Sequence, residues 1–170
     1  ADRYVTMDLH AGQIQGFFSI PGDVLSAFPM LADHIRQKNL KNAVVVAADL
    51  GFAKKARNFA VELELPVAFI EKRRSGEQSE ALTVIGDVQG KDVIIVDDEV
   101  NTAGTLANAV TLMKKSGAQD VYCCFVHPVL SGSAVERLKD LPIAEIITTN
   151  SVKIPEEKQQ QLPRLTVLSI

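Results

Sequence analysis

The most suggestive chemistry in the sequence lies in one stretch, IIVDDEVNTAGTLANAVTLMKK, which spans residues 94–115. An apolar run ends in two adjacent carboxylates, Asp97 and Asp98, and a loop rich in threonine and glycine follows them. A loop of this kind at the start of a helix offers backbone N–H groups and the positive end of the helix dipole to an anion such as phosphate. The two acids would repel a phosphate, so they should face a vicinal diol of the same ligand or a metal ion. A sugar phosphate satisfies both requirements.

The loop that follows the acids is the first candidate binding site, and it comprises Asn101, Thr102, Ala103, Gly104 and Thr105. Its glycine allows close approach of the backbone to an anion, and its two hydroxyls add donors. The loop lacks the lysine and the spacing of a P-loop, which argues against that class of nucleoside triphosphatase. The alternative, in which the two acids only cap the following turn, fits the strand–loop–helix context less well.

The segments around this loop predict an alternating α/β architecture. Four apolar runs are typical of strands buried on both faces, at residues 43–48, 66–71, 92–97 and 120–127. Amphipathic helical segments lie between them, beginning near Pro29 and at residues 52–65, 104–115 and 133–141. Two further strand-like runs are at residues 144–150 and 165–170, and the Gln-rich segment 155–163 is expected to be a surface loop. We predict one doubly wound α/β domain over residues 1–170, with helices on both faces of a mostly parallel sheet.

One stretch, residues 71–92, interrupts this alternation. It begins with the basic run EKRR, passes through a Ser-Gly turn into a second β-like run, and reaches another glycine. This order predicts a hairpin or flap that projects from the sheet with a free basic tip. A run of charges is also typical of a solvated turn, and the residues alone favour neither interpretation.

The composition limits the class of protein. The chain has 170 residues, 46% of them hydrophobic, and a net charge of −3, which suits one full core and argues against a nucleic-acid-binding surface. No apolar run is long enough to cross a bilayer and no signal peptide opens the sequence, so we expect a cytoplasmic protein. Cys123 and Cys124 are neighbours in a predicted strand, so we expect core positions without a disulfide between them. Because Ala1 already stands in a strand-like pattern, we expect the chain to be part of a longer protein.

Several motifs resemble, in order, those of one enzyme family. The acids and loop, VIIVDDEVNTAGT, are similar to the phosphoribosyl-diphosphate loop of type I phosphoribosyltransferases. DLHAGQIQGFFSIPGD, at residues 8–23, resembles the signature of ribose-phosphate diphosphokinases, also called phosphoribosyl-diphosphate synthetases. The motifs AADLGFAKKARNFA, IEKRRSG, GDVQGKDVIIVDD and FVHPVLSG are similar to the same family. The resemblance covers essentially the whole chain and corresponds to the second half of the usual family protein, without the half that carries much of the ATP site.

The resemblance implies an activity and a set of residues. Family enzymes transfer the diphosphoryl group of ATP to the 1-hydroxyl of ribose 5-phosphate, giving phosphoribosyl diphosphate and AMP, with Mg²⁺ as cofactor. Lys72 and Arg74 would be the catalytic cations, because phosphoryl transfer depends on stabilising charge on phosphate oxygens. The residues implied for ribose 5-phosphate are Asp97, Asp98, Asn101, Thr102, Ala103, Gly104 and Thr105, and those implied for Mg²⁺ and ATP are His10, Asp49, Asp8 and Asp23. An imidazole is an unusual Mg²⁺ ligand, so His10 could instead contact the nucleotide phosphates.

Three positions depart from the family pattern. Asn101 and Ser19 stand where the family usually carries aspartate, and Lys55 stands where it usually carries arginine. These changes leave the loop chemistry intact and bring the ATP half into question. Of the other histidines, we expect His34 on the surface, while His127 either lines the site or packs against it.

The leading hypothesis is therefore the second half of a diphosphokinase, inactive or nearly so by itself. Its expected partners are ATP and ribose 5-phosphate, with no nucleic acid and no membrane, and the resemblance implies a homo-oligomer built as a ring of dimers. Two alternatives are a non-catalytic regulatory subunit of the synthetase and a salvage phosphoribosyltransferase. The second of these has no place for the DLHAGQIQGFF motif.

Overall fold

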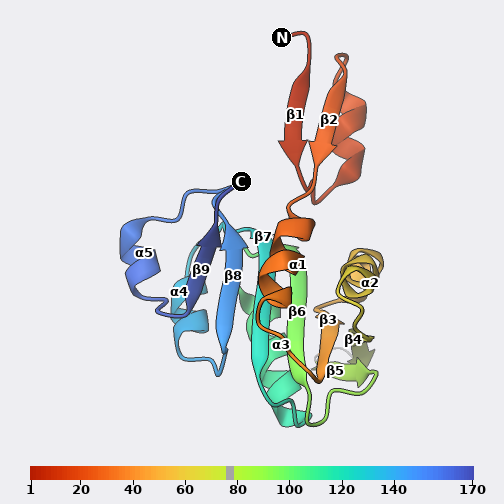
Figure 1. Cartoon of the computed structure of the whole chain (residues 1–170), viewed down its shortest axis with the longest axis vertical. Coiled ribbons are helices and arrows are strands. Elements are labelled where there is room, and N and C mark those ends of the chain that lie inside the picture. Colours follow the sequence, from red (N-terminus) through yellow and green to blue (C-terminus); the bar gives the residue numbers. More distant parts are fainter. Residues whose placement is uncertain (76–78) are drawn as a thin grey trace.

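The chain folds around a seven-stranded sheet (Figure 1). The structure is a computed structural model that describes the backbone of residues 1–75 and 79–170 and the side chains of residues 1–72 and 82–170. The strand order is β5-β4-β3-β6-β7-β8-β9, and neighbouring strands are parallel except β4 and β5. The strands are Ala43–Ala47 (β3), Val67–Ser75 (β4), Ser79–Ile85 (β5), Asp92–Glu99 (β6), Val121–His127 (β7), Glu145–Thr149 (β8) and Leu165–Leu168 (β9).

Continuous apolar runs explain why the sheet is parallel and covered on both sides. Every residue of β3, AVVVA, is buried, as are residues 93–96 of β6. Successive side chains on a strand point to opposite faces, so such runs need a helix layer on each face. All six predicted strands are present, and β4 extends beyond its predicted end.

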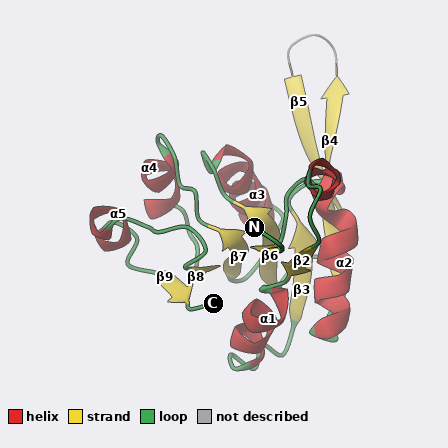
Figure 2. Cartoon of the chain, turned by 90° about the horizontal axis from the view of Figure 1, so that it is seen from above, coloured by secondary structure: helices red, strands yellow, loops and turns green. Residues whose placement is uncertain are grey.

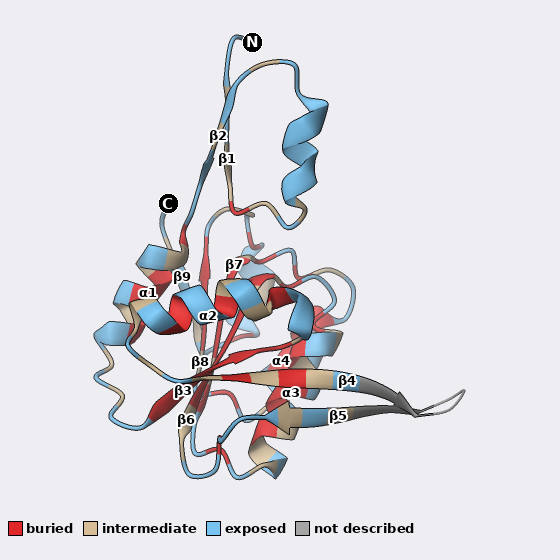
Figure 3. Ribbon diagram, turned by 90° about the vertical axis from the view of Figure 1, so that its right-hand side faces the viewer, coloured by how far each residue is buried: buried red, intermediate tan, exposed pale blue. Residues whose placement is uncertain are grey.

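Helices cover the two faces of the sheet (Figures 1 and 3). They are α1 (Phe28–Arg36), α2 (Ala53–Glu62), α3 (Gly104–Lys115) and α4 (Ala134–Lys139). The first two share one core cluster with Val45 and Ile94, and the last two share another with Val46 and Ile95. The predicted doubly wound α/β fold is therefore confirmed. In the described part of the chain, no helix is long and apolar enough to cross a membrane.

The segment at residues 155–163, expected to be a surface loop, contains a short helix instead. α5 spans Glu156–Gln160 and follows Pro155. Its residues are good helix formers, and its two glutamates lie in the first turn, where the helix dipole favours negative charge. Ile154 and Leu162, on either side, are buried in the core and fasten the turn to the sheet. The loop prediction was wrong because the helix is polar throughout, so no apolar periodicity marks it in the sequence. The burial of Ile154 and Leu162 on either side stabilises it.

The first 25 residues form a separate projection, which we call the N-terminal arm (residues 1–25). β1 (Tyr4–Met7) and β2 (Gly22–Leu25) pair in parallel as a two-stranded sheet, connected through the 3-10 helix η1 (Gly12–Phe17). A Cβ on Gly22 would lie 2.0 Å from the Tyr4 ring, so any larger residue there would force the ring to move. Figures 1 and 3 show the arm extending away from the sheet with mostly exposed surface. We refer to the rest of the chain as the body.

β4 and β5 continue past the sheet edge as an antiparallel hairpin, which we call the flap (Figure 2). The register pairs Lys72 with Leu82 and Arg74 with Glu80. The predicted hairpin is confirmed. Its predicted free tip falls on residues 76–78, which lie outside the described residues.

The two cysteines occupy the core, as predicted. Cys123 and Cys124 are buried free thiols in β7. Burial raises the pKa of each thiol above its usual value, so neither is available as a thiolate nucleophile at neutral pH.

Candidate functional site

The candidate site lies at the carboxyl ends of β3 and β6, the edge where open parallel sheets bind ligands. A pocket of about 210 Å³ opens there. Its lining residues are His10, Asp49, Asp97, Asp98, Glu99, Val100, Asn101, Thr102, Ala103, Gly104, Thr105 and Leu106. The structure thus brings together every residue predicted for ribose 5-phosphate, along with the predicted ATP-side residues His10 and Asp49. We call this the main pocket.

Residues 101–105, which we call the cradle, form the turn that starts α3. Ala103 adopts the left-handed conformation, with φ 60°, and its side chain provides no hydrogen bond to the first helical turn. The first backbone N–H groups of a helix, when no side chain caps them, together with the positive end of the helix dipole favour an anion. The side chains of Thr102 and Thr105 are exposed beside them. This geometry suits the predicted phosphate site.

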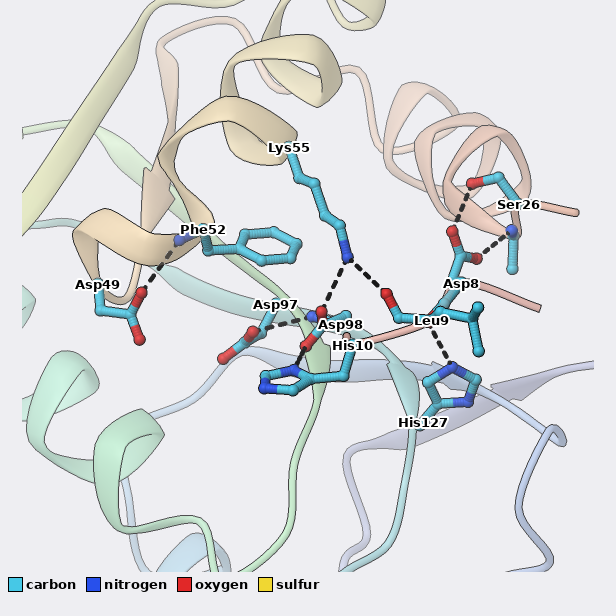
Figure 4. Close-up of polar contacts among 11 residues, drawn as sticks. Asp8, Leu9, His10, Ser26, Asp49, Phe52, Lys55, Asp97, Asp98 and His127 are labelled. Atoms are coloured by element: carbon cyan, nitrogen blue, oxygen red, sulfur yellow. Dashed lines mark hydrogen bonds and ion pairs between the residues drawn. The ribbon is translucent and has the colours of Figure 1, made fainter. Parts of the chain in front are cut away.

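The two acids have different surroundings (Figure 4). The buried Asp98 carboxylate accepts a hydrogen bond from Lys55 Nζ at 2.9 Å and lies 2.9 Å from His10 Nδ1. Burial raises the pKa of Asp98, but the bonds to His10 and Lys55 outweigh burial and hold the pKa below its usual value. Asp97 accepts from the backbone N–H of Asp98 at 2.9 Å, and burial, with the nearby charges of Asp98 and Asp49, raises its pKa to about 7. One acid is firmly ionised, whereas the other would gain from a hydroxyl donor or a cation.

His10 and Asp49 approach the acids from two different segments (Figure 4). His10 follows β1 of the arm, and its bond to Asp98 raises the pKa of the imidazole. Asp49 follows β3 and accepts from the Phe52 N–H at 3.0 Å, which caps the 3-10 helix η2 (Leu50–Phe52). Both side chains therefore have fixed places at the main pocket.

The other two predicted metal ligands lie elsewhere. The Asp8 carboxylate accepts from the Ser26 hydroxyl at 2.8 Å and the Ala27 N–H at 2.6 Å, at the start of α1. Asp23, in β2, forms an ion pair with Arg3 at 2.6 Å on the exposed arm. Neither lines the main pocket. Their role as metal ligands stays a prediction, and the structure gives each an internal partner.

The predicted catalytic cations belong to the flap. Lys72 lines a second pocket of about 170 Å³, together with Thr105 of the cradle. Because Thr105 lines both pockets, the flap lysine stands beside the cradle, and its catalytic role stays a prediction. The backbone of Arg74 lies in β4, but its side chain falls outside the described side chains, so its role stays a prediction.

The donor atoms of the main pocket suit Mg²⁺ only together with a substrate. Among the described residues, no group of three or more His, Cys, Asp and Glu side chains is spaced to hold a metal ion. Mg²⁺ commonly takes one or two carboxylates along with substrate phosphates and water, without an all-protein cage. Asp49, Asp97 and Asp98 offer hard oxygen donors around one pocket, and a cation would offset the burial of Asp97. These residues therefore fit a magnesium–substrate complex.

Two contacts that the sequence did not predict hold the cradle in place. Arg137, on α4, donates to the Thr102 carbonyl at 2.6 Å. The Asn101 side-chain oxygen accepts from the Ser131 hydroxyl, and its carbonyl accepts from the Ser131 N–H at 2.9 Å. An aspartate at position 101 could accept the same side-chain bond. Asparagine at position 101 therefore keeps the anchoring of the loop and places one negative charge fewer beside the predicted phosphate site.

Lys55 and His127 also support the site, and neither was predicted as a site residue. Lys55 donates to the Leu9 carbonyl at 3.2 Å in addition to its bond with Asp98. His127, the last residue of β7, lies 3.0 Å from the Asp8 carbonyl. The sequence had left open whether His127 lines the site or packs against it. In the structure it packs beside the main pocket and contacts Asp8. The only sequence signals were the place of Lys55 in a family motif and of His127 at a strand end.

Comparison with known proteins places the chain in a family. Residues 72–169 match the family model described as phosphoribosyl synthetase-associated domain. The ribose-phosphate pyrophosphokinase of Bacillus caldolyticus is 45% identical over 171 residues, an alignment that covers 100% of this chain and 54% of that protein. The crystal structure of phosphoribosylpyrophosphate synthetase from Mycobacterium smegmatis is 43% identical with a TM-score of 0.91, covering 99% of this chain and 55% of that one.

A more distant structure shares the fold alone. The adenine phosphoribosyl transferase from Trypanosoma brucei, solved in complex with AMP, pyrophosphate and ribose-5-phosphate, is 20% identical with a TM-score of 0.50. That alignment covers 74% of this chain and 66% of the other.

The strand order, the helix layers and the cradle define the fold of type I phosphoribosyltransferases. More particularly, the chain belongs to the phosphoribosyl synthetase-associated domain family. It spans about half the length of the curated relatives it matches. The family resemblance inferred from the motifs is confirmed.

Proposed function

We propose that the chain is the second half of a ribose-phosphate diphosphokinase and supplies its ribose 5-phosphate site and catalytic flap. The full-length enzyme would transfer the diphosphoryl group of ATP to the 1-hydroxyl of ribose 5-phosphate, giving phosphoribosyl diphosphate and AMP. The observation that carries this proposal is the meeting of the cradle, the two acids and His10 in one pocket, which Thr105 joins to the pocket of Lys72. The 45% identity to a ribose-phosphate pyrophosphokinase supports the same assignment.

The cradle and the acids would bind the two ends of the sugar phosphate. The N–H groups and hydroxyls of residues 102–105 would hold the 5-phosphate at the start of α3. Asp98, kept ionised by Lys55 and His10, is a hydrogen-bond acceptor for the sugar hydroxyls, as is Asp97. Since a sugar hydroxyl can donate to the Asp97 carboxylate in addition to the Asp98 N–H, binding would relieve part of the cost of burying Asp97.

The flap, together with His10 and Asp49 of the main pocket, would act on the nucleotide. Lys72, joined by Arg74 in the proposal, would neutralise negative charge on the transferring phosphate oxygens. His10 and Asp49 would orient the nucleotide phosphates, and Mg²⁺, when bound, would supply charge neutralisation there. By the same resemblance we propose that the full-length protein is a cytoplasmic homo-oligomer.

The test is AMP formation from ATP and ribose 5-phosphate with Mg²⁺ by the full-length protein. We expect activity in the full-length protein and nearly none in the 170-residue chain. Lys72→Ala should lower kcat by at least about 100-fold, because it removes charge stabilisation made in the transition state. Lys54→Ala, which changes an exposed lysine on α2, is the matched control and should stay within about twofold. A full-length protein that releases no AMP would overturn the enzyme assignment and favour the regulatory subunit.

A further inference from the structure

The arm contacts the body through residues 8–10, which we call the connecting segment, and these contacts lie beside the covalent junction that follows Leu25. Asp8 has φ 38°, a conformation uncommon for a residue with a side chain, and the chain turns there from β1 toward the main pocket. Its N–H donates to the Leu25 carbonyl at 2.9 Å, and its carboxylate binds the Ser26 hydroxyl and the Ala27 N–H. Such a backbone conformation persists where surrounding contacts hold it, and contacts from the body hold residues 8–10 on the other side.

His127 holds the first residue of the segment (Figure 4). Its Nε2 lies 3.0 Å from the Asp8 carbonyl, and because a carbonyl oxygen can only accept, Nε2 carries the hydrogen. Its Nδ1 lies 2.9 Å from the Ser151 hydroxyl, which can donate to a neutral ring. When the ring is protonated, the same hydroxyl can accept from Nδ1 and donate to a backbone carbonyl of β7 at 3.0 Å. His127 therefore binds Asp8 in both protonation states.

Lys55 holds the next two residues (Figure 4). Its Nζ donates to the Leu9 carbonyl at 3.2 Å and to Asp98 Oδ2 at 2.9 Å. The other oxygen of Asp98 binds His10 Nδ1. One ammonium group thus ties the backbone at Leu9 directly and the imidazole of His10 through Asp98. The Lys55 ammonium also lies 5.4 Å from the centre of the Phe52 ring, a cation–π contact that restrains the lysine itself.

We propose that Lys55 is a positioning residue, which fixes the connecting segment to the body so that the His10 imidazole stays against the acids. His10 is the lining residue of the main pocket that comes from the arm, whereas the others follow β3 or belong to β6 and the start of α3. Its place therefore depends on how the arm is held. His127 is the second anchor of the same segment. The effect on catalysis rests on the proposed function, and the effect on the position of the arm does not.

A distance measurement in this chain tests the positioning directly. Spin labels at Gln13→Cys, in η1, and Asp140→Cys, after α4, report the separation of arm and body, because both sites are exposed and the native cysteines are buried. We expect a narrow distribution of distances in the otherwise unchanged chain and one at least about twice as wide in Lys55→Met. Lys55→Arg should keep the narrow distribution because it retains the donors. Lys54→Met, the neighbouring change, should keep it as well.

Catalysis supplies the second measurement, in the full-length protein. Lys55→Met should lower kcat/KM for ATP at least about tenfold, while Lys55→Arg and Lys54→Met stay within about threefold. Inorganic phosphate binding at the cradle should change less than about twofold, because no described hydrogen bond or ion pair joins Lys55 to residues 101–105. A Lys55→Met distance distribution equal to that of the unchanged chain would overturn the proposal, whatever the rates.

The two proposals can fail separately. A full-length protein that makes no AMP removes the proposed function, and the distance measurement still decides the role of Lys55. If Lys55→Met loses its helical circular dichroism, the pair His127→Gln and His127→Leu replaces it. His127→Gln keeps an N–H donor near the Asp8 carbonyl and should keep the narrow distribution, whereas His127→Leu should widen it. Equal widths in this pair would contradict the anchoring of residues 8–10.

Discussion

A lysine and a histidine hold a carboxylate at each end of the central sheet, and the two ends differ in what surrounds that carboxylate. The rim cluster, at the carboxyl ends of the strands, consists of His10, Lys55 and Asp98, and the base cluster, at the amino ends, of His34, Lys38 and Glu145. The rim cluster borders the main pocket, whereas the base cluster lies between α1 and the start of β8. The rim histidine side chain is 67% exposed and the base histidine side chain 22%.

The base cluster uses its carboxylate entirely within the chain. Glu145 lies 3.0 Å from His34 Nε2, accepts from the Thr166 hydroxyl at 2.6 Å, and pairs with Lys38. Burial raises the pKa of Glu145, but the bonds to Lys38, Thr166 and His34 outweigh burial and hold the pKa below its usual value. His34 was expected on the surface, and that expectation was wrong because its contact with Glu145 holds the ring against the sheet, with 22% of the side chain exposed. The cluster fastens α1 to β8 and β9.

At the carboxyl ends of the strands, one carboxylate, that of Asp97, has no cation partner among the described contacts. Asp98 is paired as Glu145 is, but Asp97 beside it has a pKa raised to about 7 by burial and by neighbouring acids. Burying a carboxylate without a cation costs free energy, which a bound hydroxyl or cation can return. The same residue types therefore form an internal contact between α1 and the sheet at the base, whereas at the rim they border the pocket that we propose binds the sugar phosphate.

The largest test of this contrast is activity. In the full-length protein, Asp98→Asn should lower kcat/KM by about 100-fold or more, because it removes the ionised acceptor that His10 and Lys55 both contact. Glu145→Gln, the matched change in the base cluster, should stay within about threefold. AMP release measures both. Equal losses would show that the base cluster also shapes the site, and the contrast would fail.

The base cluster should also contribute to stability, and the same Glu145 variant tests this. Glu145→Gln should lower the free energy of unfolding by about 1–3 kcal/mol at pH 7, because it leaves Lys38 and His34 without their anion. The pKa of Glu145 is depressed in the folded chain, so its contribution is present above the unfolded pKa, about 4.3, and is lost as the pH falls through the folded value. Urea titrations at pH 7 and pH 3.5 measure it. A difference between Glu145→Gln and the unchanged chain that is as large at pH 3.5 as at pH 7 would contradict this assignment.

Asp97→Asn should stabilise the chain while impairing the site. The folded pKa of Asp97 is raised, so its penalty is absent below the unfolded pKa near 3.9, grows as the pH rises toward about 7, and is constant above that. We expect a gain of about 1–2 kcal/mol at pH 8 in a chelator and none at pH 4. The asparagine oxygen can still accept from the Asp98 N–H. A variant less stable than the parent at pH 8 would show that groups within the chain already offset the cost of burying ionised Asp97.

The rim and the base also differ in how far the sequence could predict them. The acids and the cradle are neighbours in the chain, so the apolar strand, the loop composition and the following helix identified them together. The flap followed from a charged turn between two β-like runs. The contact of His34 with Glu145 joins residues 111 positions apart, and that of His127 with Asp8 joins residues 119 apart. Local periodicity carries no information about such pairs, because only the packing of α1 and the course of the arm create them.

The smallest expected effect concerns the acid that the rim lacks. Asn101→Asp would keep the bond from Ser131, so the anchoring of the cradle should be unchanged, while the exposed position adds one negative charge beside the phosphate site. We expect the affinity for ribose 5-phosphate to fall about two- to threefold at low salt, and the free energy of unfolding to fall by a few tenths of a kcal/mol (about 0.3). Calorimetry at about 0.05 M and 0.5 M salt measures the first effect, and the higher salt should abolish it because exposed charges are screened. A larger change that survives high salt would mean that residue 101 contacts the ligand directly. The site would then lack a ligand contact at position 101, in addition to having an acid, Asp97, without a cation partner.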